Sequence, residues 1–175
     1  RFGLFDYFQG TIQNLTIKDV TIEDAGGVID NYSAQIGVFA CELSGGTIKN
    51  CINESNLEYY GENPIAVGGI VYHFTGYGKI EDCVNLGNIN GNIGFAGGIC
   101  VSSSNGAVTG GPTIKNCINK GDITIKGDAG GIATKHCNRI FDSANIGNVS
   151  TTGNAAGITY NSTLMQRCYN TGNIY

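Results

Sequence analysis

The chain has 175 residues, enough for one ordinary domain, and its hydrophobic fraction of 41% is typical of a folded protein rather than a disordered one. Its formal charge of −4 argues against a nucleic-acid partner and an anionic membrane surface. No apolar run approaches the ~20 residues of a transmembrane helix, so we expect no membrane insertion.

Two short motifs alternate along the chain. The first is a small residue, a glycine and an aliphatic residue, at 2–4, 36–38, 68–70, 97–99, 130–132 and 156–158. The second reads Ile-x-x-Cys-x-Asn, and its leading residues are Ile12, Ile48, Ile80, Ile114, Ile140 and Met165. Fixed motifs at an irregular spacing indicate a solenoid whose insertions lie in loops.

The motifs have the chemistry of strands and turns. They are short, rich in Ile, Val and Thr, and bounded by Gly, Asn and Asp, and nothing sustains a helical period. We predict an all-β fold, a right-handed parallel β-helix of about six coils. Each coil should carry three short strands, around the Gly-Gly-Ile, around the leading Ile and around a closing aliphatic residue. The closing residues are Leu57, Ile89, Ile123, Val149 and Ile174.

Four of the seven cysteines share one place in the repeat, which Leu15 and Ser143 occupy in other copies. A place that accepts Cys, Leu or Ser is a small core site, so we expect a column of stacked free thiols. Disulfides are the alternative, and a metal site is not expected because no Cys-x-x-Cys pair occurs. No cofactor is predicted either. The column consists of Cys51, Cys83, Cys117 and Cys168.

Two columns of amides flank the thiols. Asn14, Asn50 and Asn116, with Asp82 and Asp142, should occupy a sharp turn, since Asn and Asp tolerate left-handed backbone angles. The second column should point inward as a hydrogen-bonded ladder or form the next corner. It comprises Asn53, Asn85, Asn119, Asn145 and Asn170. The glycines that follow should hold a corner that only glycine enters cheaply, at Gly87, Gly121, Gly147 and Gly172.

The stretches AGGIC and TIKNCINKGDI, and RCYNTGNI at 167–174, resemble the GLUG motif family. The resemblance covers most of the chain, although the first copy departs from it at Leu15 and Ile17. GLUG repeats occur in large bacterial surface and secreted proteins, including adhesins and the non-catalytic part of IgA-cleaving metallopeptidases. The resemblance implies an extracellular or cell-surface location, and it carries over no catalytic residue.

Few residues suggest chemistry. Counted from the second glycine of the first motif, Cys41, His73, Ser102 and Lys135 share an offset of four. Cys41 and His73 could therefore lie on adjacent coils as a nucleophile and base or as half a metal site, or could share a strand edge by chance. Glu81, Asp82 and Asp142 could supply paired carboxylates, but turn chemistry already explains the two aspartates.

The loop at 57–63 is the longest aromatic and acidic stretch. Tyr59 and Tyr60 could stack on sugar rings while Glu58 and Glu62 accept hydrogen bonds from hydroxyls. The alternative is a loop that folds back and covers one side of a coil.

We interpret residues 1–175 as a single β-helix domain, a piece of a longer multidomain protein. We expect no enzyme but a segment that binds a host or cell-surface glycan or protein, or acts as a stalk. A carbohydrate-active β-helix enzyme fragment and a passive spacer are the alternatives.

Overall fold

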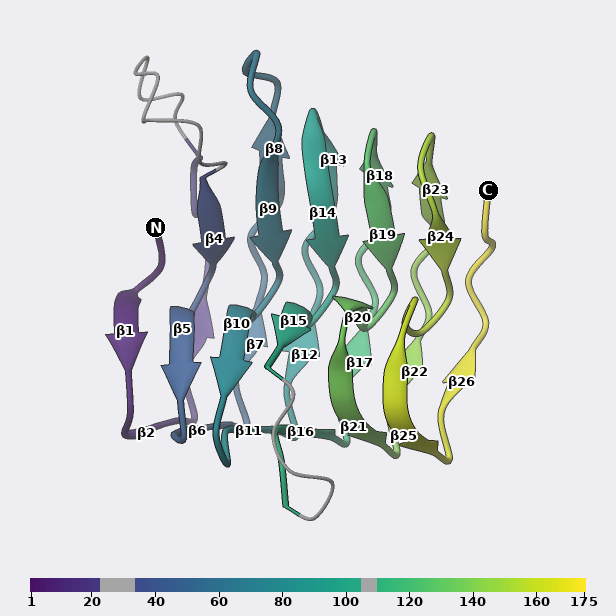
Figure 1. Ribbon diagram of the computed structural model, residues 1–175. Helices are drawn as coiled ribbons and strands as arrows, with labels where there is room; N and C mark the ends of the chain where they lie inside the picture. The colour runs from purple at the N-terminus through teal and green to yellow at the C-terminus, as the bar shows by residue number, and fades with distance from the viewer. Residues whose placement is uncertain (23–33, 105–109) are drawn as a thin grey trace.

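The computed structural model describes residues 1–22, 34–104 and 110–175, and every regular element in these ranges is a β-strand. The strands form five sheets, and all strand pairs in them run parallel. The chain meets the sheets in a fixed order and then returns to the first (Figure 1). We call one such pass a coil and number the sheets in the order in which the chain meets them.

The first three sheets carry the strand after the glycine motif and the two strands of the cysteine motif. The first sheet contains β1 (Phe5–Phe8), β5 (Ala40–Ser44), β10 (Val71–Thr75), β15 (Cys100–Ser103) and β20 (Ala133–Lys135). The second contains β2 (Thr11–Gln13), β6 (Thr47–Lys49), β11 (Lys79–Glu81), β16 (Thr113–Lys115), β21 (Cys137–Phe141) and β25 (Ser162–Gln166). The third contains β3 (Thr16–Ile17), β7 (Ile52–Asn53), β12 (Val84–Asn85), β17 (Ile118–Asn119), β22 (Ala144–Asn145) and β26 (Tyr169–Asn170).

The remaining two sheets lead back to the glycine motif. The fourth contains β8 (Leu57–Tyr59), β13 (Ile89–Gly91), β18 (Ile123–Ile125) and β23 (Val149–Thr151). The fifth contains β4 (Gln35–Gly37), β9 (Ile65–Gly68), β14 (Ile93–Gly97), β19 (Asp128–Gly130) and β24 (Ala155–Ala156). These stacked parallel sheets are consistent with a β-solenoid.

The prediction of three strands per coil is wrong, because a complete coil has five. The cysteine motif splits at Asn50, whose φ of 49° is incompatible with an extended strand, so β6 and β7 belong to different sheets. The glycine motif is also divided between two sheets, since β9 ends at Gly68, the first glycine of the pair, and β10 begins at Val71. Only the closing aliphatic residue, as at Leu57, contributes the single strand that was expected.

Equivalent residues of successive coils lie directly beside one another. In the second sheet Ile80 pairs with Ile48 on one side and with Ile114 on the other, and the same register runs from Ile12 to Met165. Side chains alternate between the two faces of a strand, so each isoleucine points inward while its neighbours face solvent. This confirms the vertical register that the repeats predict.

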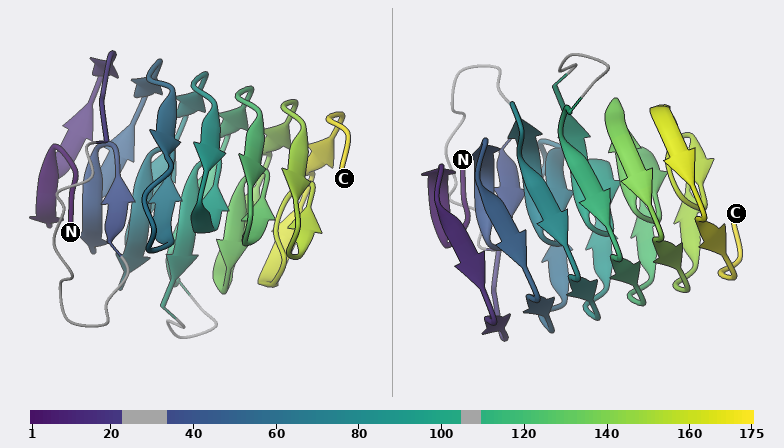
Figure 2. Two further views of the ribbon diagram at one scale, coloured as in Figure 1. Left: turned by 90° about the horizontal axis from the view of Figure 1, so that it is seen from above. Right: turned by 90° about the horizontal axis from the view of Figure 1, so that it is seen from below.

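The interior between the sheets is filled by aliphatic and aromatic side chains. Ile48, Phe39 and Phe74 are fully buried in it, together with the isoleucine that follows each glycine pair, such as Ile99. Figure 2 shows the coils in one row, with the two termini at opposite ends. The core is therefore a continuous column along the row, and each coil covers the apolar face of the next.

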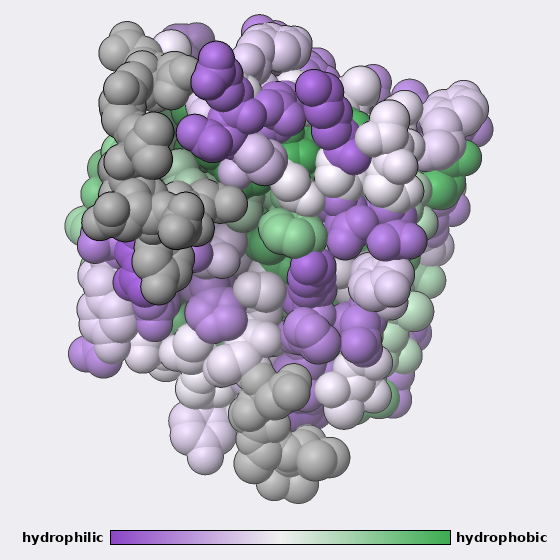
Figure 3. All heavy atoms as spheres, turned by 45° about the horizontal axis from the view of Figure 1, so that its top comes forward, coloured by the Kyte–Doolittle hydropathy of each residue, from purple (hydrophilic) through white to green (hydrophobic). Residues whose placement is uncertain are grey.

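Large hydrophobic side chains reach the surface mainly at the two ends of the row (Figure 3). Phe2 and Leu4 are about half exposed at one end, and Met165 and Ile174 at the other. The sides of the row carry mostly polar groups. The described ranges contain no helix that is long and apolar enough to cross a membrane.

Candidate functional site

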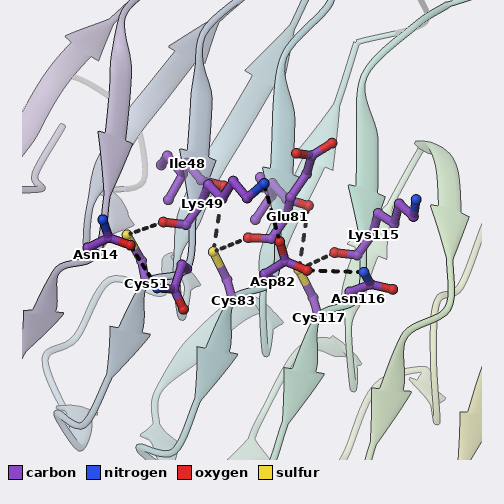
Figure 4. Close-up of polar contacts among 12 residues, drawn as sticks. Asn14, Ile48, Lys49, Cys51, Glu81, Asp82, Cys83, Lys115, Asn116 and Cys117 are labelled. Atoms are coloured by element: carbon purple, nitrogen blue, oxygen red, sulfur yellow. Dashed lines mark hydrogen bonds and ion pairs between the residues drawn. The ribbon is translucent and has the colours of Figure 1, made fainter.

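The cysteines of the repeat form a column between the second and third sheets. Figure 4 shows Cys51, Cys83 and Cys117 side by side, each at the same bend of its coil. The Sγ of Cys83 lies 3.1 Å from the carbonyl oxygen of Glu81 and 3.6 Å from that of Ile48 in the preceding coil. The same two contacts recur in neighbouring coils, so each thiol bridges its own bend to the coil before it.

All seven cysteines are free in the structure, including the four of the column. The neighbouring Cys83 thiol and burial raise the pKa of the Cys51 thiol, and the neighbouring Cys117 thiol raises the pKa of Cys83. Burial and the neighbouring Cys137 raise the pKa of Cys100, whose Sγ lies 3.4 Å from the Cys137 Sγ. The thiols with a raised pKa are protonated at neutral pH, when they are weak hydrogen-bond donors rather than nucleophiles. The Cys100–Cys137 pair has no counterpart in the repeat, and so the sequence motif did not reveal it.

The second asparagine column is an inward ladder rather than a corner, and its members from Asn53 to Asn145 are buried. The Nδ2 of Asn85 donates to the Oδ1 of Asn119 at 2.7 Å, and the Nδ2 of Asn119 donates to the Oδ1 of Asn145 at 2.8 Å. Each Nδ2 also donates to the carbonyl oxygen two residues later, as from Asn119 to Gly121 at 2.9 Å. The buried amides thereby satisfy one another's hydrogen-bonding groups. The series runs from Asn53 to Asn170.

The second glycine of the glycine motif lies against this ladder and makes room for its side chains. A Cβ on Gly98 would lie 2.4 Å from the Cγ of Asn119 and 2.2 Å from the carbonyl oxygen of Gly131. Gly131 meets Asn145 in the same way. The two motifs of the repeat are therefore complementary, since the second glycine leaves the room that the amide of the next coil occupies.

The first asparagine column forms the predicted left-handed turn. The φ angles of Asn14, Asn50, Asp82, Asn116 and Asp142 lie between 49° and 58°. The asparagines of the column are exposed and the aspartates half-buried, and members pair across coils, as from Asn116 Nδ2 to Asp82 Oδ1 at 3.0 Å (Figure 4). Arg167 occupies the same place in the last copy, with a φ of 51°, and pairs with Asp142.

Sequence reasoning missed a third polar column. The backbone N–H of Asp122 donates to the Oδ1 of Asn88 at 2.8 Å, and the N–H of Asn148 donates to the Oδ1 of Asp122 at 2.7 Å. The signal was present, since an Asn or Asp directly precedes each closing aliphatic residue. The column consists of Asn56, Asn88, Asp122, Asn148 and Asn173.

The glycines at the corner before this column are needed there, as predicted, although their backbones are not left-handed. Left-handed glycines in the described ranges are Gly45, Gly76, Gly91 and Gly110. Glycine is needed at the corner because the coils approach closely there. A Cβ on Gly121 would lie 1.9 Å from the carbonyl oxygen of Gly87.

The candidate ligand residues of the 57–63 loop separate in the structure. Tyr59 belongs to β8 and is buried in the core, whereas Tyr60 is 73% exposed just beyond the strand. Glu58 and Glu62 are exposed. The Tyr59 ring therefore cannot stack on a ligand, and only one of the two tyrosines remains available.

Cys41, His73, Ser102 and Lys135 were predicted to share one position on neighbouring coils, and the structure replaces one of these four residues. In the first sheet His73 pairs with Ser102 on one side, and Ser102 pairs with Lys135, as expected. On the other side His73 pairs with Glu42 rather than Cys41. The reason is that Gly37 pairs with Gly68, the first glycine of its pair, so the count from the second glycine was one residue short. We call Glu42, His73, Ser102 and Lys135 the first-sheet row.

A surface hollow of about 240 Å³ opens over this row at the junction with the fifth sheet. The Nδ1 of His73 lies 2.7 Å from the Oγ of Ser102, and an Arg1 nitrogen lies 2.9 Å from a Glu42 oxygen. Cys41 is one of the lining residues, and its Sγ lies 3.5 Å from the carbonyl oxygen of Gln35. The hollow is lined by Arg1, Gln35, Cys41, Glu42, Tyr72, His73 and Ser102.

The electrostatics of the hollow favour neutral groups. Burial lowers the pKa of His73, which leaves its imidazole uncharged at neutral pH, and Arg1 offsets the charge of Glu42. Burial also raises the pKa of the Tyr72 hydroxyl and of the Cys41 thiol, so both stay protonated. Lys135 lies beyond the hollow, where its Nζ is 3.4 Å from the centre of the Phe95 ring.

Carboxylates and metal ligands do not converge into a metal site anywhere in residues 1–22, 34–104 and 110–175. No group of three or more His, Cys, Asp or Glu side chains there could hold a metal ion. Asp82 contacts Asn116 and Lys49, and Asp142 contacts Arg167, so these carboxylates are engaged at the turn.

Comparisons with protein-family models, with curated proteins and with solved structures found no match.

Proposed function

We propose that the chain is a right-handed parallel β-helix of about six coils that presents a ligand-binding face, as an adhesive segment does. It is a non-catalytic part of a larger bacterial cell-surface or secreted protein. The observation that carries this proposal is the hollow, whose lining does not follow the repeat. Stacking accounts for identical residues at inward positions, but it does not require Glu42, His73 and Ser102 to line one hollow.

The ladders support the rod-like part of the proposal. Thiols and amides recur in each column and bond to the coil beside them, so the repeated polar side chains are engaged in holding one coil on the next. The resemblance of RCYNTGNI to GLUG repeats supports a surface location and further domains in the same polypeptide. Together these features suit a rigid support with one specialised face.

The enzyme alternative is less favoured by the local geometry. Ser102 and His73 are spaced as a nucleophile and its base would be. A serine nucleophile also needs nearby backbone donors for the oxyanion. The N–H groups of Cys100 and Ser104, which lie two residues before and two residues after Ser102, donate to the carbonyls of Ile132 and Phe74 in adjacent coils. We therefore assign the pair to binding.

The test is a direct binding screen with a parallel activity assay. Beads coated with the 175-residue chain are applied to printed host and bacterial glycans and to immobilised extracellular proteins, with heat-unfolded chain as the control. Saturable binding that needs the folded chain is expected, without release of reducing sugars from polysaccharides. Retention on none of the surfaces would support a passive spacer, and release of reducing sugars would support an enzyme.

A further inference from the structure

We infer that the hollow over the first-sheet row binds one neutral sugar residue, through hydrogen bonds from its polar wall and contact with the Tyr72 ring. This inference rests on the proposed ligand-binding role and names the class of ligand. It depends on the hollow's size, on its balance of charge and on the kinds of groups that line it.

The size of the hollow suits one small ring. Its volume of about 240 Å³ is below the ~300–1,000 Å³ of pockets that enclose drug-sized ligands. Apart from Arg1, the lining comes from β5, β10 and β15, which lie side by side in the first sheet, and from β4 of the fifth sheet (Figure 1). Because the backbones of these strands are held by parallel pairing, the wall is formed before a ligand arrives and binding orders few groups.

The charge of the hollow argues against an ionic ligand. The Arg1 guanidinium and the Glu42 carboxylate are paired with each other, and burial keeps the His73 ring neutral. An anion or a cation would lose hydration on entering and would find no unpaired opposite charge. A neutral polar molecule loses less, because its hydroxyls exchange water for the groups of the wall.

The wall offers both donors and acceptors. Ser102 engages the Nδ1 of His73, so the Nε2 is the ring nitrogen left to contact a ligand. The Arg1 contact is made to one Glu42 oxygen, the Oε2, and the other oxygen can accept a hydroxyl. The Gln35 side chain adds an amide. The wall therefore contains both hydrogen-bond donors and acceptors, which suit sugar hydroxyls because each hydroxyl can donate and accept a hydrogen bond.

The aromatic residue completes the match. Tyr72 is half-buried at the hollow, and its ring centre lies 6.2 Å from that of His73 at an interplanar angle of 45°. An aromatic ring provides an apolar surface with one polar tip. A sugar ring has an apolar C–H face and a hydroxylated rim, so it can contact the ring and the polar wall together.

The test uses defined sugars and an isotope-labelled chain. Glucose, galactose, mannose, N-acetylglucosamine and their methyl glycosides are titrated while the backbone amide signals are followed by NMR. At least one neutral sugar should saturably shift the amides of Glu42, His73 and Ser102. A methyl glycoside that binds at least as well as the free sugar identifies a residue within a glycan, whereas preference for the free sugar identifies a soluble ligand.

Two variants separate this site from the rest of the surface. Ser102→Ala should weaken binding about fivefold, the effect of one lost hydrogen bond. Thr124→Ala removes an exposed hydroxyl from the fourth sheet and should leave affinity unchanged. Glu42→Gln, which keeps the size of the side chain, provides a second test and should also weaken binding. Thermal unfolding of each variant verifies that it folds.

Three outcomes would overturn the inference. One is the absence of shifts at the hollow with every neutral sugar at millimolar concentration. Another is tighter binding of glucuronate than of glucose, because the ligand would then be an anion. The third is unchanged affinity in Ser102→Ala and Glu42→Gln. If the binding screen finds a ligand while these tests fail, the adhesive role stands and the ligand lies on another face.

Discussion

Two columns of asparagine run along this protein, and each coil contributes one residue to each column. The two columns select asparagine for different reasons. The inner column, represented by Asn119, is buried and selects an amide because each member must both donate and accept. The outer column, represented by Asn116, is exposed and selects residues that tolerate a left-handed backbone. Its members include aspartate and even Arg167. A repeated residue type therefore does not define one structural role.

The largest effect should come from charge in the inner column. Asn119→Asp removes the donor to Asn145 and to the carbonyl of Gly121, and it buries a carboxylate. Breaking a buried, paired polar group in this way should lower the free energy of unfolding by about 3–5 kcal/mol. Urea-induced unfolding followed by circular dichroism measures the loss.

The same substitution in the outer column is the matched control. Asn14→Asp keeps an oxygen that accepts from the Nδ2 of Asn50, which lies 2.7 Å from the Asn14 Oδ1. It reproduces the pairing of Asn116 with Asp82, so stability should change by less than about 0.5 kcal/mol. Equal losses in the two variants would contradict the distinction between the columns.

A smaller loss should follow from Gly98→Ala, which tests the contact between the glycine motif and the inner column. The new methyl group would overlap the Asn119 side chain and the backbone of Gly131, and overpacking of this kind costs about 1–3 kcal/mol. The cost should fall when Asn119 is also alanine, because the amide is then gone. A double-mutant cycle of urea midpoints measures this coupling, and strictly additive losses would show that the two motifs are independent.

The smallest effect should separate backbone from side chain in the outer column. Asn116→Ala and Asn116→Gly both lose the hydrogen bond to Asp82. Only alanine is strained at the φ of 52°, by about 1 kcal/mol, so the glycine variant should be the more stable of the two. Differential scanning calorimetry compares them. An alanine variant as stable as the glycine variant would mean that the turn conformation does not select asparagine here.

Much of the frame was predictable from residue spacing. The all-β class, the isoleucine and cysteine columns and the left-handed turn at Asn50 each followed from a residue type that recurs at one place in the repeat. The candidate site was less predictable. His73, Ser102 and Lys135 were grouped correctly, whereas Glu42 was missed because Gly37 takes the place of the first glycine rather than the second.

The sequence by itself determined that like residues stack from coil to coil, because parallel strands in register place each side chain beside its counterpart. Only the tertiary structure decided that a coil bends into five strands, that Asn119 faces inward while Asn116 faces solvent, and that Glu42 completes the hollow. These features depend on backbone angles at single residues and on a one-residue register between distant segments. The sequence motifs specify neither these backbone angles nor this register.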